Sequence, residues 1–229
     1  MSGFRRRLMM ARKQQGDSYD YITDGLKLHL DGMWNGGVGV HLDSTDTWVD
    51  LSQFGNDATT INGTQVTFGK DYASCANNDG FVSLVGIPAA HDLTVEVWFK
   101  SGFTGANRGV GCWGYGSPQR FSFSCWRNKL QYMRGGSLNG GVSFYDHAAF
   151  TYNKENTIFR LYNSGVETTT YTVDLTNTRD QTPAIGINVK FDSNTYSSGD
   201  IYMVRVYDRT LSAEEIAYNT ALDNKRLGK

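Results

Sequence analysis

The segment from Leu93 to Lys100 constrains the fold more than any other part of the chain, because its apolar residues recur at every second position. The residues at these positions are Leu93, Val95, Val97 and Phe99. Successive side chains of a β-strand point to opposite faces, so these four are expected on one core-facing side. Trp98 falls on the other side, where we interpret it as a packing residue of a central strand. The segment therefore predicts a strand within a sheet.

Further short segments of strand character follow along the chain, separated by turns rich in Gly and Asn. The turns between 108 and 133 are short enough for antiparallel hairpins, so this part predicts a meander. No point between 25 and 212 has the composition of a linker, and 229 residues suit one large β domain. The expected strands are 25–30, 48–51, 93–100, 108–113, 120–126, 129–133, 147–152, 157–163, 166–173 and 201–207.

One helix is clearly indicated, near the C-terminus. Ser212 and Glu215 have the spacing of a capping box, and Leu211 can pack against Ile216 as a hydrophobic staple. We expect this helix to begin near Ala213 and to run for about ten residues.

Several motifs recur in a characteristic order over about residues 25–219. They are Gly25–Leu26, Trp48–Ser52, Gly55–Ala58, Leu93–Lys100, His147–Tyr152, Leu161–Gly165 and, most specific of all, Val204–Glu215. In this order they resemble the laminin-G-like branch of the concanavalin A-like lectin/glucanase superfamily. The resemblance implies an all-β fold, a jelly-roll sandwich of two antiparallel sheets. The alternating strands agree with it and predict one solvent-facing side for each sheet.

Two departures from the family pattern bear on a metal site. Tyr145-Asp146-His147 stands where the family usually has Trp-His-His, and Tyr202 stands where many members have an Asp that helps to hold a structural calcium ion. The family's calcium is therefore not carried over, and we expect no cofactor.

A loop between residues 31 and 46 offers oxygen atoms that suit calcium, but the same residue types are typical of solvated turns. Both interpretations stay open for these side chains, which are Asp31, Asn35, Asp43 and Asp46.

Catalysis is not expected from this sequence. The superfamily includes retaining glucanases, which need two carboxyl groups about 5 Å apart. No Glu of the chain is followed by an acid two positions later on a strand, and the four His lack zinc spacing. The Glu residues are Glu96, Glu155, Glu167, Glu214 and Glu215. A glycoside hydrolase of the same fold is the alternative.

Aromatic residues of the meander form the candidate ligand site. Trp113, Tyr115, Trp126 and Tyr132 lie in or beside its strands, with Arg127 next to them. Sugar rings present apolar C–H faces that stack on aromatic side chains, while charged and amide groups orient their hydroxyls. The same aromatic side chains can instead fill the core between the sheets, and the sequence leaves both interpretations open.

The first residues form a predicted basic arm. Residues 1–16 carry five basic residues and no acid, a charge of +5, which leaves −6 of the total of −1 for the rest. The apolar run behind the arginines is shorter than in a secretion signal, and no stretch is long enough to span a membrane. We divide the chain into an arm with its linker, residues 1–24, and a body, residues 25–229. The assembly residues of the arm are Phe4, Arg5, Arg6, Arg7 and Arg12.

These features indicate a non-catalytic, lectin-like module that binds glycan or docks on a larger assembly. The odd number of cysteines, three, argues against a disulfide framework and fits synthesis in a reducing cytosol. A lectin-like domain without an export signal is typical of a phage virion protein, so we expect it on a virion or another extracellular surface. Its expected partners are glycan, other virion or surface proteins, or further copies of itself. The alternatives are a capsid or tail decoration protein without sugar binding, and a bacterial glycan-binding protein exported by another route.

Overall fold

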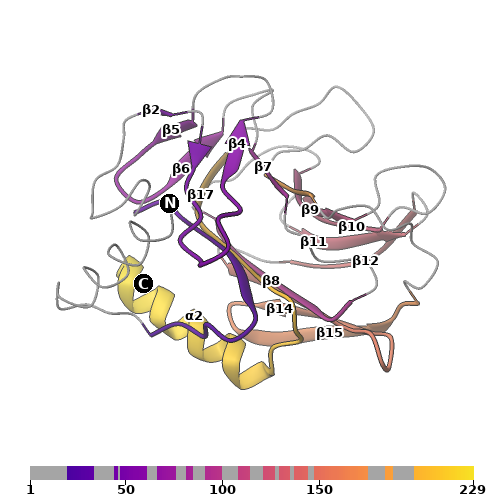
Figure 1. Ribbon diagram of the computed structural model, residues 1–229. Coiled ribbons are helices and arrows are strands. Elements are labelled where there is room, and N and C mark those ends of the chain that lie inside the picture. Colours follow the sequence, from indigo (N-terminus) through magenta and orange to yellow (C-terminus); the bar gives the residue numbers. More distant parts are fainter. Residues whose placement is uncertain are drawn as a thin grey trace.

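The described residues of the structure, a computed structural model, form two antiparallel β-sheets packed face to face and one long helix near the C-terminus (Figure 1). It is the expected all-β jelly-roll sandwich. The basic arm lies outside the described residues. These residues are 20–33, 44–45, 47–60, 66–75, 81–84, 91–99, 108–113, 121–126, 129–134, 137–143, 147–174, 184–187 and 199–229.

The first sheet, sheet A, has nine strands in the described part of the chain, in the order β15-β14-β13-β8-β17-β6-β5-β2, with β1 also paired to β17. Its strands are β1 (Leu26–Asp31), β2 (Ser44–Thr45), β5 (Val66–Phe68), β6 (Ala73–Cys75), β8 (Leu93–Phe99), β13 (His147–Asn153), β14 (Ile158–Asn163), β15 (Val166–Thr172) and β17 (Gly199–Tyr207).

The second sheet, sheet B, has eight strands among the described residues, in the order β12-β11-β10-β9-β16-β7-β4-β3. Its strands are β3 (Thr47–Trp48), β4 (Ala58–Thr60), β7 (Phe81–Leu84), β9 (Arg108–Trp113), β10 (Phe121–Trp126), β11 (Lys129–Arg134), β12 (Ser137–Ser143) and β16 (Ala184–Ile187). The predicted meander is present as β9, β10 and β11, with β12 added at its edge.

The core between the sheets follows the alternation read from the sequence. Leu93, Val95, Val97 and Phe99 of β8 all belong to it, together with Trp48 from sheet B. β8 lies between β13 and β17 in the middle of sheet A, which confirms the prediction of a central strand.

Most strand bounds lie within two residues of the prediction, but two predicted segments end further from the observed elements. The strand expected over 48–51 ends at Trp48, because the backbone N–H of Asp50 donates to the Asp57 side chain instead of to a neighbouring strand. The helix, α2 (Ala213–Leu227), has 15 residues instead of about ten. It ends where Gly228 takes a left-handed conformation, at φ 68°.

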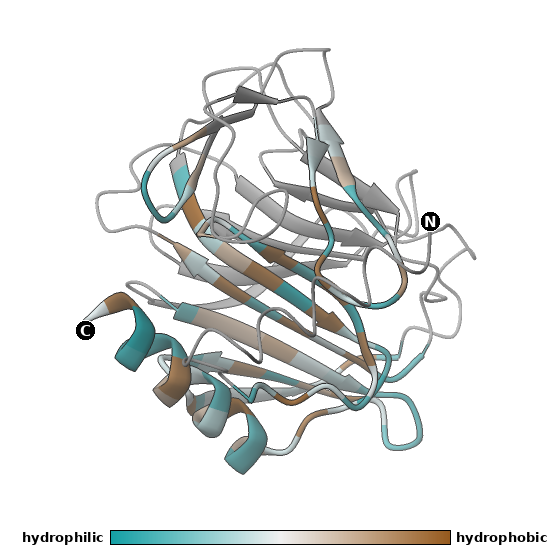
Figure 2. Ribbon diagram, turned by 60° about the vertical axis from the view of Figure 1, so that its left-hand side comes forward, coloured by the Kyte–Doolittle hydropathy of each residue, from teal (hydrophilic) through white to brown (hydrophobic). Residues whose placement is uncertain are grey.

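The start of α2 is confirmed in detail. The Ser212 side chain accepts a hydrogen bond from the Glu215 backbone N–H, and the Glu215 side chain accepts one from the Ser212 N–H, which makes a complete capping box. Leu211 and Ile216 lie in one apolar cluster, as the staple predicted. Figure 2 shows that much of α2 is hydrophilic, so apolar packing alone does not explain how it is held.

Candidate functional site

The predicted ligand-site residues lie on the meander of sheet B. Trp113 is the last residue of β9 and Trp126 the last of β10, and Tyr132 lies in β11. Because β9 and β10 are antiparallel, the two tryptophan positions stand at opposite ends of this strand pair. Tyr115 and Arg127 lie outside the described residues. The strands that carry the site are therefore adjacent, and its role in binding stays a prediction.

The outer face of sheet A is covered over its central strands. Thr94, Glu96 and Trp98 point away from the core of the sandwich, yet their exposed fractions are 0%, 0% and 2%. α2 and residues 20–24 lie over this face, and a second apolar cluster forms between them and the strands (Figure 1). The expectation of one solvent-facing side for each sheet is thus wrong for sheet A, because the sequence pattern of its strands does not show the helix that covers them.

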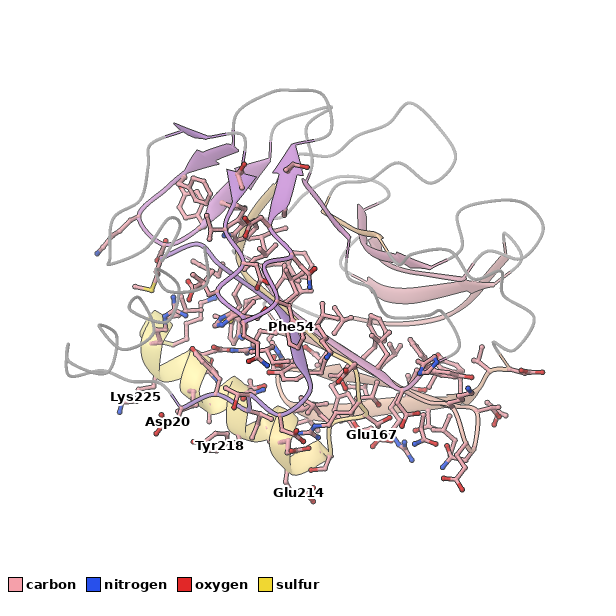
Figure 3. The ribbon with its side chains drawn as sticks, in the orientation of Figure 1. Asp20, Phe54, Glu167, Glu214, Tyr218 and Lys225 are labelled. Carbon is pink, nitrogen blue, oxygen red and sulfur yellow. The ribbon has the colours of Figure 1, made fainter. Side chains whose placement is uncertain are left out.

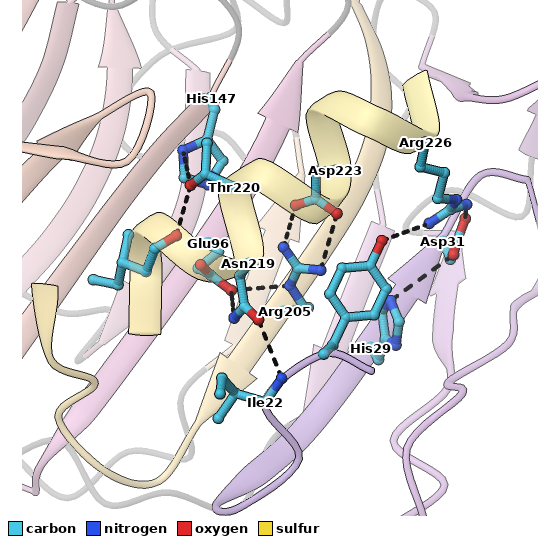
Figure 4. Close-up of polar contacts among 12 residues, drawn as sticks. Ile22, His29, Asp31, Glu96, His147, Arg205, Asn219, Thr220, Asp223 and Arg226 are labelled. Carbon is cyan, nitrogen blue, oxygen red and sulfur yellow. Dashed lines mark hydrogen bonds and ion pairs between the residues drawn. The ribbon is translucent and has the colours of Figure 1, made fainter. Parts of the chain in front are cut away.

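Arg205 of β17 is the centre of a polar cluster beneath α2 (Figure 4). Its side chain is fully buried, and its Nε donates to Glu96 Oε2 of β8 at 2.9 Å. Its two terminal nitrogens donate to the two carboxylate oxygens of Asp223 on α2, one of them at 3.2 Å. The ring of Tyr21 lies 4.3 Å from the guanidinium carbon. Arg205 therefore joins the sheet, the helix and the segment that precedes β1.

Asn219 of α2 makes a second set of links. Its Nδ2 donates to Glu96 Oε2 at 2.9 Å and to the Tyr207 hydroxyl at 3.0 Å. Its Oδ1 accepts from the backbone N–H of Ile22 at 3.1 Å. Residues 20–24, which the sequence placed with the linker, are thus bonded to the body, while the division of the chain into arm and body stays a prediction.

The C-terminal end of α2 is held in the same way. Arg226 pairs with Asp31 of β1, and its Nη1 donates to the Tyr21 hydroxyl at 3.4 Å. Asp31 is one of the residues that could have bound calcium, and the structure instead uses it for this ion pair. The other three predicted oxygen ligands lie outside the described residues. Among the described residues, no group of three or more His, Cys, Asp or Glu side chains is placed to hold a metal ion.

His147 of β13 lies under the middle of α2. The Thr220 hydroxyl donates to the Ile216 carbonyl at 2.7 Å, so its contact of 3.4 Å with His147 Nδ1 requires the imidazole to carry the proton there. Burial, and after it the positive charge of Arg205, lowers the pKa of His147 from 6.5 to about 3. His147 is therefore neutral over the physiological range. The Trp98 ring packs beside it, with ring centroids 5.2 Å apart.

Burial sets the electrostatics of the remaining groups. It raises the pKa of Glu96 above its usual value, although Arg205 works in the opposite direction. Burial also raises the pKa values of the Tyr21 and Tyr207 phenols, so both keep their protons. The attraction of Asp223 and then Glu96 outweighs burial for Arg205 and raises the pKa of its guanidinium. Arg205 therefore stays charged between its two carboxylate partners.

A family comparison agrees with this fold. A laminin-G-type family model, described as the concanavalin A-like lectin/glucanases superfamily, matches residues 68–217, well over half of the chain. The chain belongs to this superfamily. No curated protein sequence matches it. Among the residues that the structure describes, no helix is long and apolar enough to cross a membrane.

Solved structures share the superfamily fold at low sequence identity. The binding domain of Paraclostridial Mosquitocidal Protein 1 has a TM-score of 0.63 at 15% identity, over 86% of this chain and 52% of that one. The binding domain of botulinum neurotoxin DC, in complex with rat synaptotagmin II, has a TM-score of 0.62 at 12% identity. The match covers 89% of this chain and 52% of that one. Trypanosoma rangeli sialidase in complex with sialic acid has a TM-score of 0.63 at 14% identity. The match covers 98% of this chain and 38% of the sialidase. The chain thus spans about half of each toxin domain and less of the sialidase, and the likeness concerns the fold.

Proposed function

We propose that this superfamily member is a non-catalytic carbohydrate-binding module whose ligand surface lies on sheet B. One observation carries the proposal: α2 and residues 20–24 cover the central strands of sheet A on their outer face, while no described helix lies over the meander of sheet B (Figure 1). The meander strands carry Trp113, Trp126 and Tyr132, which are the residue types on which sugars stack. Membership of a lectin-like superfamily supports the same kind of function.

The non-catalytic part of the proposal rests on the environment of the carboxylates. Glu96 and Asp223 share one guanidinium and are fully buried beneath α2. A glycosidase needs its acid and its nucleophile on both sides of a bound sugar. We therefore assign these carboxylates to the attachment of the helix. Purified protein should release no reducing sugar from β-glucans, and turnover that disappears in Glu96→Gln would overturn this assignment.

We further propose that the basic arm attaches the module to a larger assembly, such as a phage virion. The described segment next to the arm supports this, because Ile22 is bonded to α2 and Asp24 forms an ion pair with Arg209. A pull on the arm would therefore act on the folded body. Deletion of residues 1–16 should leave the thermal unfolding of the body unchanged and should abolish co-purification with the assembly. Unchanged incorporation of the truncated protein would count against an anchoring arm.

The test of glycan binding compares the wild type with Trp113→Ala and Trp126→Ala on an array of immobilised glycans. Loss of a stacking side chain should weaken binding by about 1–3 kcal/mol and leave the fold intact. Tyr218→Ala is the matched control, since Tyr218 is an exposed aromatic residue on α2, away from the meander. A large fall in thermal stability with unchanged binding would show that the tryptophans fill the core. A wild type that binds no glycan yet joins the assembly would favour the structural decoration protein.

A further inference from the structure

The turn between β3 and β4 is fixed by one buried carboxylate. Asp50 accepts hydrogen bonds from the backbone N–H groups of His29 at 2.9 Å, Ser52 at 2.8 Å and Asn56 at 2.8 Å. The Ser52 hydroxyl lies 2.7 Å from its second oxygen. One side chain thus holds both ends of the turn and the neighbouring strand β1, which leaves residues 52–57 little freedom.

Two further features fix the same turn. The Asn56 side chain donates from Nδ2 to the Lys27 carbonyl of β1 at 2.9 Å. Gly55 has φ 74°, a left-handed conformation that side chains other than glycine rarely adopt. The backbone of the turn is therefore fixed without any contribution from the side chain at position 54.

Phe54 projects from this rigid turn into solvent. It is 47% exposed, and among the residues whose burial the structure describes, it and Tyr218 are the two exposed large aromatic residues (Figure 3). The Lys27 ammonium lies 4.0 Å from the centroid of the Phe54 ring and 2.7 Å from Asp208 Oδ2. The ring is thus oriented by a cation on one face, and that cation is itself held by a carboxylate.

We propose that Phe54 forms a second carbohydrate subsite, which takes a neutral pyranose stacked on the face of its ring opposite Lys27. The C–H face of a sugar matches an exposed aromatic ring, and the Lys27 ammonium, which covers the other face, holds the ring in place. Lys27 and Asp208, which pair with each other, have 26% and 38% of their side chains exposed and supply the charge next to the ring. Their charges cancel, which favours a neutral sugar over an acidic one.

The rigidity of the turn favours binding over a passive surface position. A flexible loop loses conformational entropy when it binds a ligand, and a preorganised one loses less. Here the ring is already held by the turn and by Lys27 in the free protein. This inference rests on the proposed carbohydrate binding but places a subsite away from the meander, at the end of the sandwich where β1 meets the turn.

The experiment measures binding of oligosaccharides to four proteins: the wild type, Phe54→Ala, Phe54→Trp and Tyr218→Ala. The oligosaccharides are neutral ones of gluco, galacto and manno configuration and, for comparison, acidic ones. Phe54→Ala should lower the affinity by about tenfold or more, and Phe54→Trp should keep or raise it, because the larger ring also stacks. Tyr218→Ala removes an aromatic side chain of nearly equal exposure, 46% against 47%, and should bind as the wild type does. Thermal unfolding of all four should coincide, since the backbone bonds of the turn do not involve the Phe54 ring.

The outcomes separate the subsite from the wider function. Wild-type binding that persists unchanged in Phe54→Ala overturns the subsite and leaves carbohydrate binding at the meander intact. A wild type that binds neither neutral nor acidic oligosaccharides overturns both proposals. Binding of acidic sugars alone, insensitive to Phe54→Ala, also overturns the subsite. A loss of affinity for neutral oligosaccharides in Phe54→Ala, together with wild-type or higher affinity in Phe54→Trp, supports the subsite.

Discussion

Replacement of His147 by Asn should make the protein less sensitive to acid. His147 is buried under α2 and neutral, with its pKa lowered from 6.5 to about 3, chiefly by burial and secondly by Arg205. Between these two values the unfolded chain binds a proton at this residue and the folded protein does not. Stability therefore depends on this histidine as pH falls: its contribution is complete above pH 6.5 and is lost progressively below it.

The size of the effect follows from the two pKa values. Between pH 7 and pH 4.5, the difference in proton binding lowers the free energy of unfolding by about 2.5 kcal/mol. Because pH 4.5 lies above the pKa of His147 in the folded protein, this figure depends almost entirely on the ordinary pKa of His147 in the unfolded chain. Glu96 acts in the opposite direction, since its raised pKa favours the folded state in acid. The comparison must therefore be made between the variant and the wild type.

Urea unfolding of both proteins at pH 7 and pH 4.5 measures this difference. Asn can place an amide nitrogen near the position of Nδ1 and keep the contact with Thr220, but it does not titrate. The variant should lose about 2.5 kcal/mol less than the wild type between the two pH values, whatever its stability at pH 7. His91→Asn is the control, because His91 is exposed. An equal loss in His147→Asn and the wild type would refute the argument.

Three further variants test other contacts. Arg205→Met leaves Glu96 and Asp223 buried without their cation and should lower the free energy of unfolding by about 3–5 kcal/mol, measured in urea; a change below 1 kcal/mol would contradict a buried pair. Ser212→Ala removes the N-cap of α2 and should cost about 1 kcal/mol in the same assay, an effect that vanishes if the helix end is frayed. Replacement of the arginines within residues 1–16 by Ala should weaken incorporation into the assembly more at low salt than at high salt, because salt screens the charge contacts that the wild type makes, and a loss that does not change with salt would contradict this.

The parts of the fold that follow local rules could be predicted from the sequence. The alternation in β8 places Val95 and Val97 in the core, and the Ser212 capping box fixes the first residue of α2. Strands such as β4 and β16 were missed because they have three and four residues, too few for a period of two to be recognised. Their pairing depends on partners that are distant along the chain.

The polar cluster beneath α2 could not be predicted, because each of its residues, taken by itself, is of a type expected at a solvent-facing position. Glu96 occupies a position where a solvent-facing residue is expected, and Arg205 occupies the matching position on the last strand. Only the pairing of β8 with β17 places them side by side, and only the docking of α2 buries them. A usable signal existed in the helix: Asn219 and Asp223 are four residues apart and share one face, which marks that face as polar.

The polar contacts of α2 fix its position on sheet A. Among its inward side chains only Ile216 is apolar, and apolar contact alone would allow a helix to slide along a sheet. Asn219, Thr220, Asp223 and Arg226 contact four different strands, namely β8, β13, β17 and β1. Each contact is satisfied at one position of the helix, so the set specifies a single register, which is the best attested role of buried polar groups. The central strands of sheet A are thereby occupied by α2, which is why we place the proposed ligand surface on sheet B.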